Sequence, residues 1–354
     1  MIRNVKKLII GMIILCLVSI ALLVSCEKEE EVRKEAGKEA EAYRVAVFVP
    51  GVVAGSPIYE QLVSGAEKAV AEYPNASLKV IEGGFNQAEW GEKITSLAAT
   101  GEYNVIITSN PAMPFVILDM TKAFPDQKFI CFDAFYKGNS QMHTVLYNQV
   151  EQAYFLGYLG GLITVSSMAG ANSDMKVGMV VAQQYPALDK MMVPGYKLGF
   201  QAVDPAITMD FRVIGNWYDA NKAAALANSM IDSGVDVIAT IAGGANQGVI
   251  NACKERGKYV LYFDSNELAM APGVIVGCGL LYQEKLVSEV LKEAIQGKVP
   301  YGEARIVTAE QGYVDFADDD PLYIKSVAAD VREAMDIVVK KIRSGELRLA
   351  APEL

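Results

Sequence analysis

Two aspartates and one histidine are the side chains in this 354-residue sequence that first suggest proton transfer. Asp133 and Asp264 each follow a predicted strand, where a carboxylate can act as a general base, cap a helix or accept hydrogen bonds from a polyol. His143 is the only histidine, so a Ser-His-Asp triad could be built only around it. A hydrolase with Asp133 or Asp264 as its base stays open, but only carboxylates support it. We therefore assign no catalytic residue.

The sequence offers few groups that could hold a metal ion. Cys131, Cys253 and Cys278 are far apart, which fits neither a zinc site nor a disulfide framework, and each lies in surroundings typical of a buried free thiol. Residues 318–320 are three successive aspartates, but they lack the spacing of a calcium loop and are expected to form a solvated turn. We expect neither a metal ion nor a cofactor.

Two short motifs could contact a ligand. Residues 243–248 (GGANQG) open a predicted helix after a strand, so their backbone N–H groups could hold an anion. This motif lacks the lysine ending of a P-loop and the spacing of a dinucleotide site, and a tight turn close to a ligand is the simpler interpretation. Trp217 and Tyr218 follow another strand and could stack on a ring; packing within the fold is the alternative.

The hydrophobic pattern predicts an α/β protein. Short β-branched runs such as 105–107 and 237–241 have no polar alternation, as expected of strands buried on both faces. They alternate with helical patterns of 10–15 residues, which is typical of βαβ units and parallel sheets. The alternation restarts after Gln149, so we predict two Rossmann-like lobes that meet near this residue.

Ligands of open parallel sheets bind beyond the carboxyl ends of the strands. Two facing sheets would therefore form a cleft lined by the residues that follow each strand, and we expect its walls to include Trp217, Tyr218 or Asp264. The residues that follow the predicted strands are amides, hydroxyls, aromatics and two acids, which suit a neutral, flat, hydrogen-bonding ligand. The predicted ligand-binding residues are Ser56, Tyr59, Asn110, Asp133, Asn148, Gln184, Trp217, Tyr218, Gly243, Gly244, Asn246, Asp264 and Asn266.

The first 42 residues are predicted to lie outside the folded part. Residues 1–25 join a basic start to an apolar run too short for a stable membrane span, as in a signal peptide. The run ends in Leu-Val-Ser before Cys26, which resembles a bacterial lipobox and predicts a lipid anchor on the cell membrane, facing the periplasm or the exterior. An uncleaved anchor is the alternative. Residues 26–42 read as a charged tether, and a net charge of −10 without a basic stripe disfavours nucleic acid as a partner.

A series of motifs in a fixed order resembles the basic membrane protein family, which includes purine nucleoside receptor lipoproteins. The motifs are residues 125–129 (PDQKF), 154–161 (YFLGYLGG), 195–200 (GYKLGF), 235–238 (VDVI), 243–250 (GGANQGVI) and 263–266 (FDSN). The resemblance covers residues 43 to about 347. It implies a type I periplasmic binding protein-like fold whose lobes, 43–149 with about 275–305 and 150–274 with about 306–354, share a three-segment hinge. It also implies a receptor that closes on its ligand and serves an ABC permease.

Departures from the family pattern concern the ligand. The family's acid that contacts the purine and its lysine that contacts the sugar are replaced by Val49 and, near the lysine position, Leu281. The aromatic position at Trp217 and the acceptor Asp264 persist. Losing the purine and ribose contacts favours a different ligand, because sites built for specific hydrogen bonds reject ligands that leave them unpaired. The family's treponemal riboflavin-binding lipoproteins make riboflavin or a related flavin our prediction. A purine nucleoside receptor and a sensory ligand-binding module remain alternatives.

Overall fold

The computed structural model describes residues 42–84 and 86–354. The predicted signal peptide, the lipid anchor at Cys26 and nearly all of the tether therefore lie outside the described residues. The strands are β1 (Tyr43–Val49), β2 (Ala76–Glu82), β3 (Val105–Ser109), β4 (Lys128–Phe132), β5 (Met142–Tyr147), β6 (Lys176–Val181), β7 (Thr208–Val213), β8 (Val237–Ile241), β9 (Tyr259–Asp264), β10 (Ile275–Leu281), β11 (Ala304–Val307) and β12 (Val314–Phe316).

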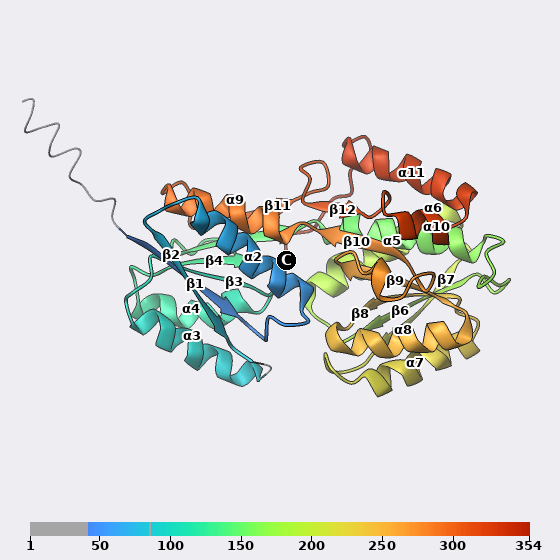
Figure 1. Ribbon diagram of the computed structural model, residues 1–354, viewed down its shortest axis with the longest axis horizontal. Coiled ribbons are helices and arrows are strands. Elements are labelled where there is room, and N and C mark those ends of the chain that lie inside the picture. The colour runs from blue at the N-terminus through green and yellow to red at the C-terminus, as the bar shows by residue number, and fades with distance from the viewer. Residues whose placement is uncertain (1–41, 85) are drawn as a thin grey trace, which may run out of the picture. The chain divides into compact units, whose positions relative to one another are not determined.

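Helices alternate with these strands along the chain (Figure 1). They are α2 (Pro57–Ala71), α3 (Trp90–Ala99), α4 (Met113–Ala123), α5 (Gln149–Thr164), α6 (Val193–Val203), α7 (Ala220–Asp232), α8 (Asn246–Arg256), α9 (Gln283–Ile295), α10 (Pro321–Ser326) and α11 (Ala329–Arg343). A π-helical turn, Leu188–Met192, leads into α6. Within the described ranges, no helix is long and apolar enough to cross a lipid bilayer.

The strands form two six-stranded sheets with matching topology. Their orders are β11-β5-β4-β3-β1-β2 and β12-β10-β9-β8-β6-β7. The pairs β1–β3, β3–β4, β4–β5 and β5–β11 of the first sheet and β6–β7, β6–β8, β8–β9 and β9–β10 of the second are parallel, whereas β12 runs antiparallel to β10. We call the first sheet with α2, α3, α4 and α9 lobe 1, and the second with its helices lobe 2. The prediction of an α/β protein built from two Rossmann-like halves is confirmed.

The chain crosses between the lobes three times: after β5, after β10 and between β11 and β12. The expected return to lobe 1 near residue 275 is corrected, because β10 pairs with β9 and β12 in the second sheet. The return therefore falls between Leu281 and Gln283. Lobe 1 also extends to Val307, the end of β11. The sequence pattern of a short apolar strand does not indicate which sheet the strand joins. The boundary between the lobes near β10 could therefore not be predicted from it.

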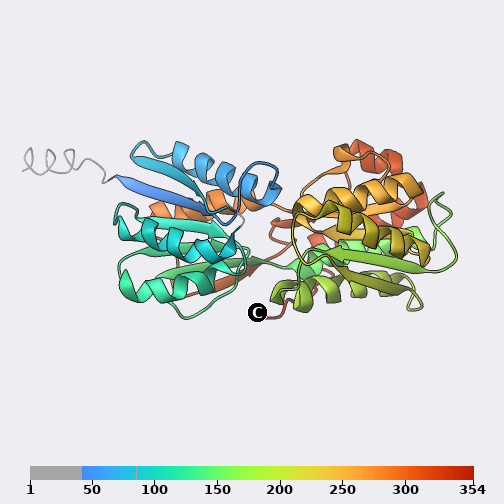
Figure 2. The same ribbon diagram turned by 90° about the horizontal axis from the view of Figure 1, so that it is seen from below.

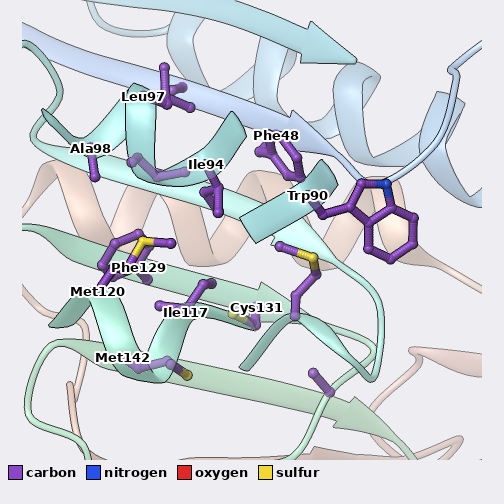
Figure 3. Close-up of a cluster of buried hydrophobic side chains, with 14 residues drawn as sticks. Phe48, Trp90, Ile94, Leu97, Ala98, Ile117, Met120, Phe129, Cys131 and Met142 are labelled. Atoms are coloured by element: carbon purple, nitrogen blue, oxygen red, sulfur yellow. The ribbon is translucent and has the colours of Figure 1, made fainter. Parts of the chain in front are cut away.

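The core of lobe 1 explains why its strands are apolar on both faces. On one face Phe48 and Phe129 are fully buried beneath α3 and α4 (Figure 3). Ile106 belongs to the same buried cluster. Successive strand side chains point to opposite faces, so Val47 and Ile107 pack toward α2 and α9, and both are also fully buried. Figure 2 shows α3 and α4 on the near side of the first sheet and α7 and α8 on the near side of the second.

Helix α5 is the first element of lobe 2 and begins directly after the first crossing. All but two of its 16 residues are buried, which accounts for a helix without a polar face. Glycines let it approach α6 closely: a Cβ added to Gly157 would lie 2.0 Å from the carbonyl oxygen of Tyr196. Gly199 on α6 meets the backbone of Tyr154 in the same way. The glycine-rich motifs of the sequence therefore hold two helices together.

Candidate functional site

Asp133 and Asp264 occupy the same place in the two sheets. Asp133 directly follows β4, Asp264 ends β9, and β4 and β9 are equivalent strands. Both residues have positive φ angles, 49° and 77°, a conformation that is uncommon outside glycine and that aspartate tolerates better than most residues. Each lobe therefore presents one aspartate, held in an unusual backbone geometry, at the carboxyl end of its sheet.

The carboxyl groups of Asp133 and Asp264 lie close enough for the charge of Asp264 to affect the titration of Asp133. Burial raises the pKa of Asp133 well above its usual range, and the charge of Asp264 raises it further. Burial also raises the pKa of Asp264. After burial itself, both charges contribute to raising the pKa values of Tyr147 in lobe 1 and Tyr185 in lobe 2. The charges of the two aspartates therefore act on one tyrosine in each lobe.

Tyr59 and Asn110 add polar groups from lobe 1. The Tyr59 hydroxyl donates to the carbonyl oxygen of Pro50 at 3.0 Å and accepts from Asn110 at 3.5 Å. Burial raises the pKa of Tyr59 to about 12, and the charge of Asp133 adds to this effect. The structure therefore brings the predicted residues Tyr59, Asn110, Asp133 and Asp264 together.

Trp217 and Tyr185 form an aromatic pair in lobe 2. Their ring centroids are 6.3 Å apart with planes 38° from parallel. Trp217 is half-buried and donates from its indole nitrogen to Gln183 at 3.3 Å. The turn that starts at Gly243 supports it, because a Cβ added to Gly243 would lie 3.3 Å from the Trp217 carbonyl oxygen. Tyr218, in contrast, is 75% exposed. The Trp217 ring thus neighbours Tyr185, whose pKa is raised by burial and by the charges of both aspartates.

The first turn of α5 contacts both aspartates. The Gln149 amide donates to Asp133 at 3.1 Å, and the Gln152 amide donates to Asp264 at 3.0 Å. The list of predicted binding residues included neither glutamine. The available signal was the presence of amides at the start of a helix that is otherwise apolar.

Several predicted residues are engaged elsewhere in the fold. The Asn148 amide donates to the Leu349 carbonyl oxygen, and the Asn246 side-chain oxygen accepts from Thr240 and from the Ala242 N–H. Asn266 donates to Asp320, and Gln184 donates to Asp189. Ser56 occupies the N-cap position of α2, where its side chain makes no capping bond. Ligand contacts of these five residues, like those of the others, stay predictions.

A pocket of about 300 Å³ lies beside this cluster. It is lined by Pro57, Glu60, Gln61, Ser64, Ser265, Glu267 and Glu284. Trp217, Tyr218 and Asp264 do not line it, which departs from the walls that we expected. Asp264 accepts a hydrogen bond from Gln152 on α5, whereas four of the residues that line the pocket lie on α2. The candidate site is therefore defined by the hydrogen-bonded side chains around Asp133 and Asp264, and not by this pocket.

Apart from the two aspartates, the groups considered for chemistry lie outside this site. His143 is fully buried in β5, where its Nδ1 lies 2.8 Å from the Glu303 carbonyl oxygen. Asp318 pairs with Arg343 and Asp320 caps α10, so the expected solvated turn is an ion-paired one. The three cysteines within the described ranges are buried and free, as predicted. No group of three or more potential metal ligands occurs among the described residues.

Comparisons with known proteins agree with this architecture. A family model described as ABC transporter substrate-binding protein PnrA-like matches residues 42–348. Basic membrane protein B of Borrelia garinii subsp. bavariensis is 26% identical over 265 residues, which cover 65% of this chain and 74% of that protein. The ABC transporter nucleoside-binding protein BmpA of Lactococcus lactis subsp. cremoris is 27% identical over 144 residues, 40% of this chain and 38% of that protein.

Other relatives match over a shorter stretch. The CD4+ T-cell-stimulating antigen of Listeria monocytogenes is 26% identical over 44% of this chain, and the match spans 42% of that protein's length. Among solved structures, a solute-binding protein of an ABC transporter system from Aeropyrum pernix has a TM-score of 0.76 at 20% identity, covering 88% of this chain and 94% of that one. The glucose-galactose binding protein GanP of Geobacillus stearothermophilus has a TM-score of 0.61 at 17% identity, covering 79% and 99%. These structures confirm the type I solute-binding fold.

Proposed function

Because this chain belongs to the family of PnrA-like ABC transporter substrate-binding proteins, we propose that it is an extracytoplasmic receptor that binds a small solute between its lobes and delivers it to an ABC permease. The observation that carries this proposal is that the first turn of α5 donates hydrogen bonds to Asp133 of lobe 1 and to Asp264 of lobe 2, and that both charges act on Tyr185, the ring partner of Trp217 in lobe 2. A solute that contacts both sets favours the closed arrangement through interactions that the open one lacks. The lipid anchor at Cys26 would keep the receptor at the membrane.

The ligand that we propose is riboflavin or a related flavin. Its ring would stack on the Trp217 and Tyr185 pair, and its hydroxylated chain would donate to the aspartates. The positions at which the family has a purine-binding acid and a sugar-binding lysine hold Val49 and Leu281. Both are aliphatic, and they are 0% and 2% exposed. Their burial supports a ligand other than a purine nucleoside.

A purine nucleoside is the second candidate. The observation that favours it is the similarity to a relative named as a nucleoside-binding protein. A nucleoside also combines a flat ring with vicinal hydroxyl groups, so it would use the same two kinds of contact.

Titration of the mature protein into riboflavin tests the proposal. We expect quenching of flavin fluorescence that saturates at one ligand per protein molecule. Trp217→Ala should weaken binding about 5- to 150-fold, corresponding to about 1–3 kcal/mol for a stacked ring. Trp217→Phe keeps an aromatic surface and serves as the matched control, with most of the affinity retained.

Two other outcomes would redirect the assignment. No flavin binding, together with a higher melting temperature in inosine or guanosine, would identify a nucleoside receptor. Unchanged flavin affinity in Trp217→Ala would show that Trp217 packs within lobe 2 and contacts no ring.

A further inference from the structure

Residues 347–354 lie over the junction between the two lobes, and we call them the strap. They follow α11 of lobe 2, which ends before Gly345, a residue in the left-handed conformation that is common after helices (φ 73°). The Leu347 N–H donates to the Lys341 carbonyl oxygen at 2.9 Å, so the start of the strap is fixed to α11. Figure 1 and Figure 2 both show the C-terminus between the two lobes.

The strap covers a small apolar cluster that contains residues of both lobes. Leu146 contributes from β5 of lobe 1, and Val150 and Met191 contribute from lobe 2; the three residues are at most 4% exposed. Phe135, which follows β4, and Ile306 in β11 pack against this cluster from lobe 1. The cluster is therefore assembled only when the two lobes are held as they are in this structure.

The strap has one buried side and one exposed side. Leu349, Ala351 and Leu354 pack against the apolar cluster and are partly buried. Arg348 and Ala350, which alternate with the first two of them, are exposed. Alternation with a period of two is typical of an extended segment with one face on a core. Because the removal of apolar surface from water is favourable, the buried side of the strap favours the arrangement in which the cluster is intact.

A buried asparagine adds a polar contact between the strap and the crossings. Asn148, at the first crossing, is 3% exposed, and its side-chain amide donates to the Leu349 carbonyl oxygen at 2.8 Å. The N–H of Asn148 donates to the carbonyl oxygen of Val307, at the end of β11, at 2.7 Å. Arg348 forms an ion pair with Glu310 beyond β11, but both side chains are exposed and the pair contributes little. Asn148 thus joins the strap to the first and the third crossing, where a two-lobed protein bends.

We propose that the strap is a conformational device that links the two lobes and restricts their motion relative to each other. It forms a fourth link beside the three crossings. Its contacts with lobe 1 are noncovalent, so this link can be released while the crossings stay intact. A link that favours one lobe arrangement changes the apparent affinity of any ligand bound between the lobes, because only the competent fraction of molecules binds. The inference goes beyond the proposed function, since it does not depend on which ligand is bound.

Distances between spin labels in the ligand-free protein test the inference. The labels are introduced through Asp119→Cys on α4 and Ser229→Cys on α7, which are exposed positions in lobe 1 and lobe 2. Double electron–electron resonance then gives the distribution of distances between the lobes. Cys131, Cys253 and Cys278 are buried, and labelling of the parent chain without the two substitutions measures the background.

Variants of the strap distinguish a link between the lobes from a passive surface segment. Ala351→Asp places a charge in the apolar contact, and we expect it to broaden the distance distribution. Ala350→Asp makes the same change at the neighbouring exposed position and should leave the distribution as it is in the parent chain. A chain that ends after Leu347 lacks all three packing side chains and should show the largest broadening. Circular dichroism checks that each variant is folded.

The outcomes are distinguishable from those that concern the ligand, because these measurements contain none. An unchanged distribution in the shortened chain and in Ala351→Asp would overturn the inference even if the melting temperatures fall, since the strap would then stabilise the fold without restricting the lobes. Equal broadening in Ala350→Asp and Ala351→Asp would also overturn it, because the added charge and not the apolar contact would be the cause. If the shortened chain does not fold, the comparison of the two aspartate variants gives the answer alone.

Discussion

Glu151 is a buried carboxyl group at the start of α5. It is 4% exposed, and its Oε2 accepts from the N–H of Ala309 at 2.8 Å, which joins the first crossing to the third. Burial raises its pKa from 4.5 to about 7, against the opposing effect of that hydrogen bond. The proton on Glu151 is therefore exchanged near neutral pH, at a place where two chain crossings meet.

A pH dependence of stability follows for Glu151. The folded state favours the protonated form, so this group stabilises the protein fully below about pH 4.5 and loses its contribution as the pH rises through about 7. Compared with Glu151→Gln, the wild type should lose up to about 3 kcal/mol of unfolding free energy over this range. Urea unfolding at about pH 5 and about pH 8 measures the difference. Parallel profiles for the two proteins would contradict the assignment.

At the scale of single residues, the sequence located the candidate site only in part. Asp133, Asp264 and Trp217 were found because each follows a strand, and strand ends are where open sheets bind ligands. The sequence placed Asp133 and Asp264 in one predicted cleft, but it could not show how close the two carboxyl groups come, because the lobes are joined through distant parts of the chain. Asn246 was predicted to bind the ligand because it is an amide that follows a strand. In the structure, its side-chain oxygen accepts hydrogen bonds within its own turn.

The contact between α5 and α6 leads to a prediction at the scale of the element. Gly157→Ala would place a methyl group 2.0 Å from the Tyr196 carbonyl oxygen, so the helices must separate. We expect a loss of about 3 kcal/mol in stability, at the upper end of the usual cost of overpacking. Thermal unfolding followed by circular dichroism measures the change.

Gly91→Ala on α3 is the control, since its nearest neighbour is a Val116 methyl at 3.9 Å, and it should stabilise the protein by about 0.5 kcal/mol. Equal melting temperatures for the two variants would show that α5 and α6 separate at little cost.

Whether a segment forms a helix or a strand was easier to predict from the sequence than the sheet to which a strand belongs. The buried runs in β3 and β8 were recognised because β-branched residues without polar alternation fit strands covered on both faces. The sheet to which β10 belongs was not, because its pairing partners β9 and β12 are chosen by the path of the whole chain. Periodicity reports the local environment of a segment and is silent about its neighbours.

At the scale of the whole molecule, Gln283 joins the crossings. It begins α9 and is fully buried. Its amide donates to the Ile58 carbonyl oxygen at 2.6 Å, and its side-chain oxygen accepts from Ser109 at 3.1 Å and from Tyr147 at 3.3 Å. The second crossing is thus tied to α2, to the end of β3 and to the first crossing. The side-chain amide of Gln283 thus uses its oxygen and one of its two N–H bonds in hydrogen bonds.

Removal of the Gln283 amide should therefore destabilise the protein as a unit. Gln283→Leu keeps much of the volume but leaves buried groups of Ile58, Ser109 and Tyr147 without a partner, which costs about 1–3 kcal/mol for each group that water cannot reach. We expect a lower urea midpoint with a single transition. Gln296→Leu, at an exposed amide beyond α9 that donates to Tyr73, should change the midpoint little. A midpoint equal to the wild type in Gln283→Leu would show that the crossings do not depend on this side chain.

The interleaved path of the chain bears on how the protein is made. Lobe 1 is covered on one face by α9 and closed at one edge by β11, and both are encoded after all but one strand of lobe 2. A chain that emerges from its N-terminus first must therefore leave the part of this face that α9 covers exposed until residue 295 has been released, and the edge of the sheet unpaired until residue 307 has followed. Neither lobe completes before the other is nearly synthesised. We infer that the two lobes fold late and together, with the uncovered face of the first sheet as the surface that a chaperone would need to protect.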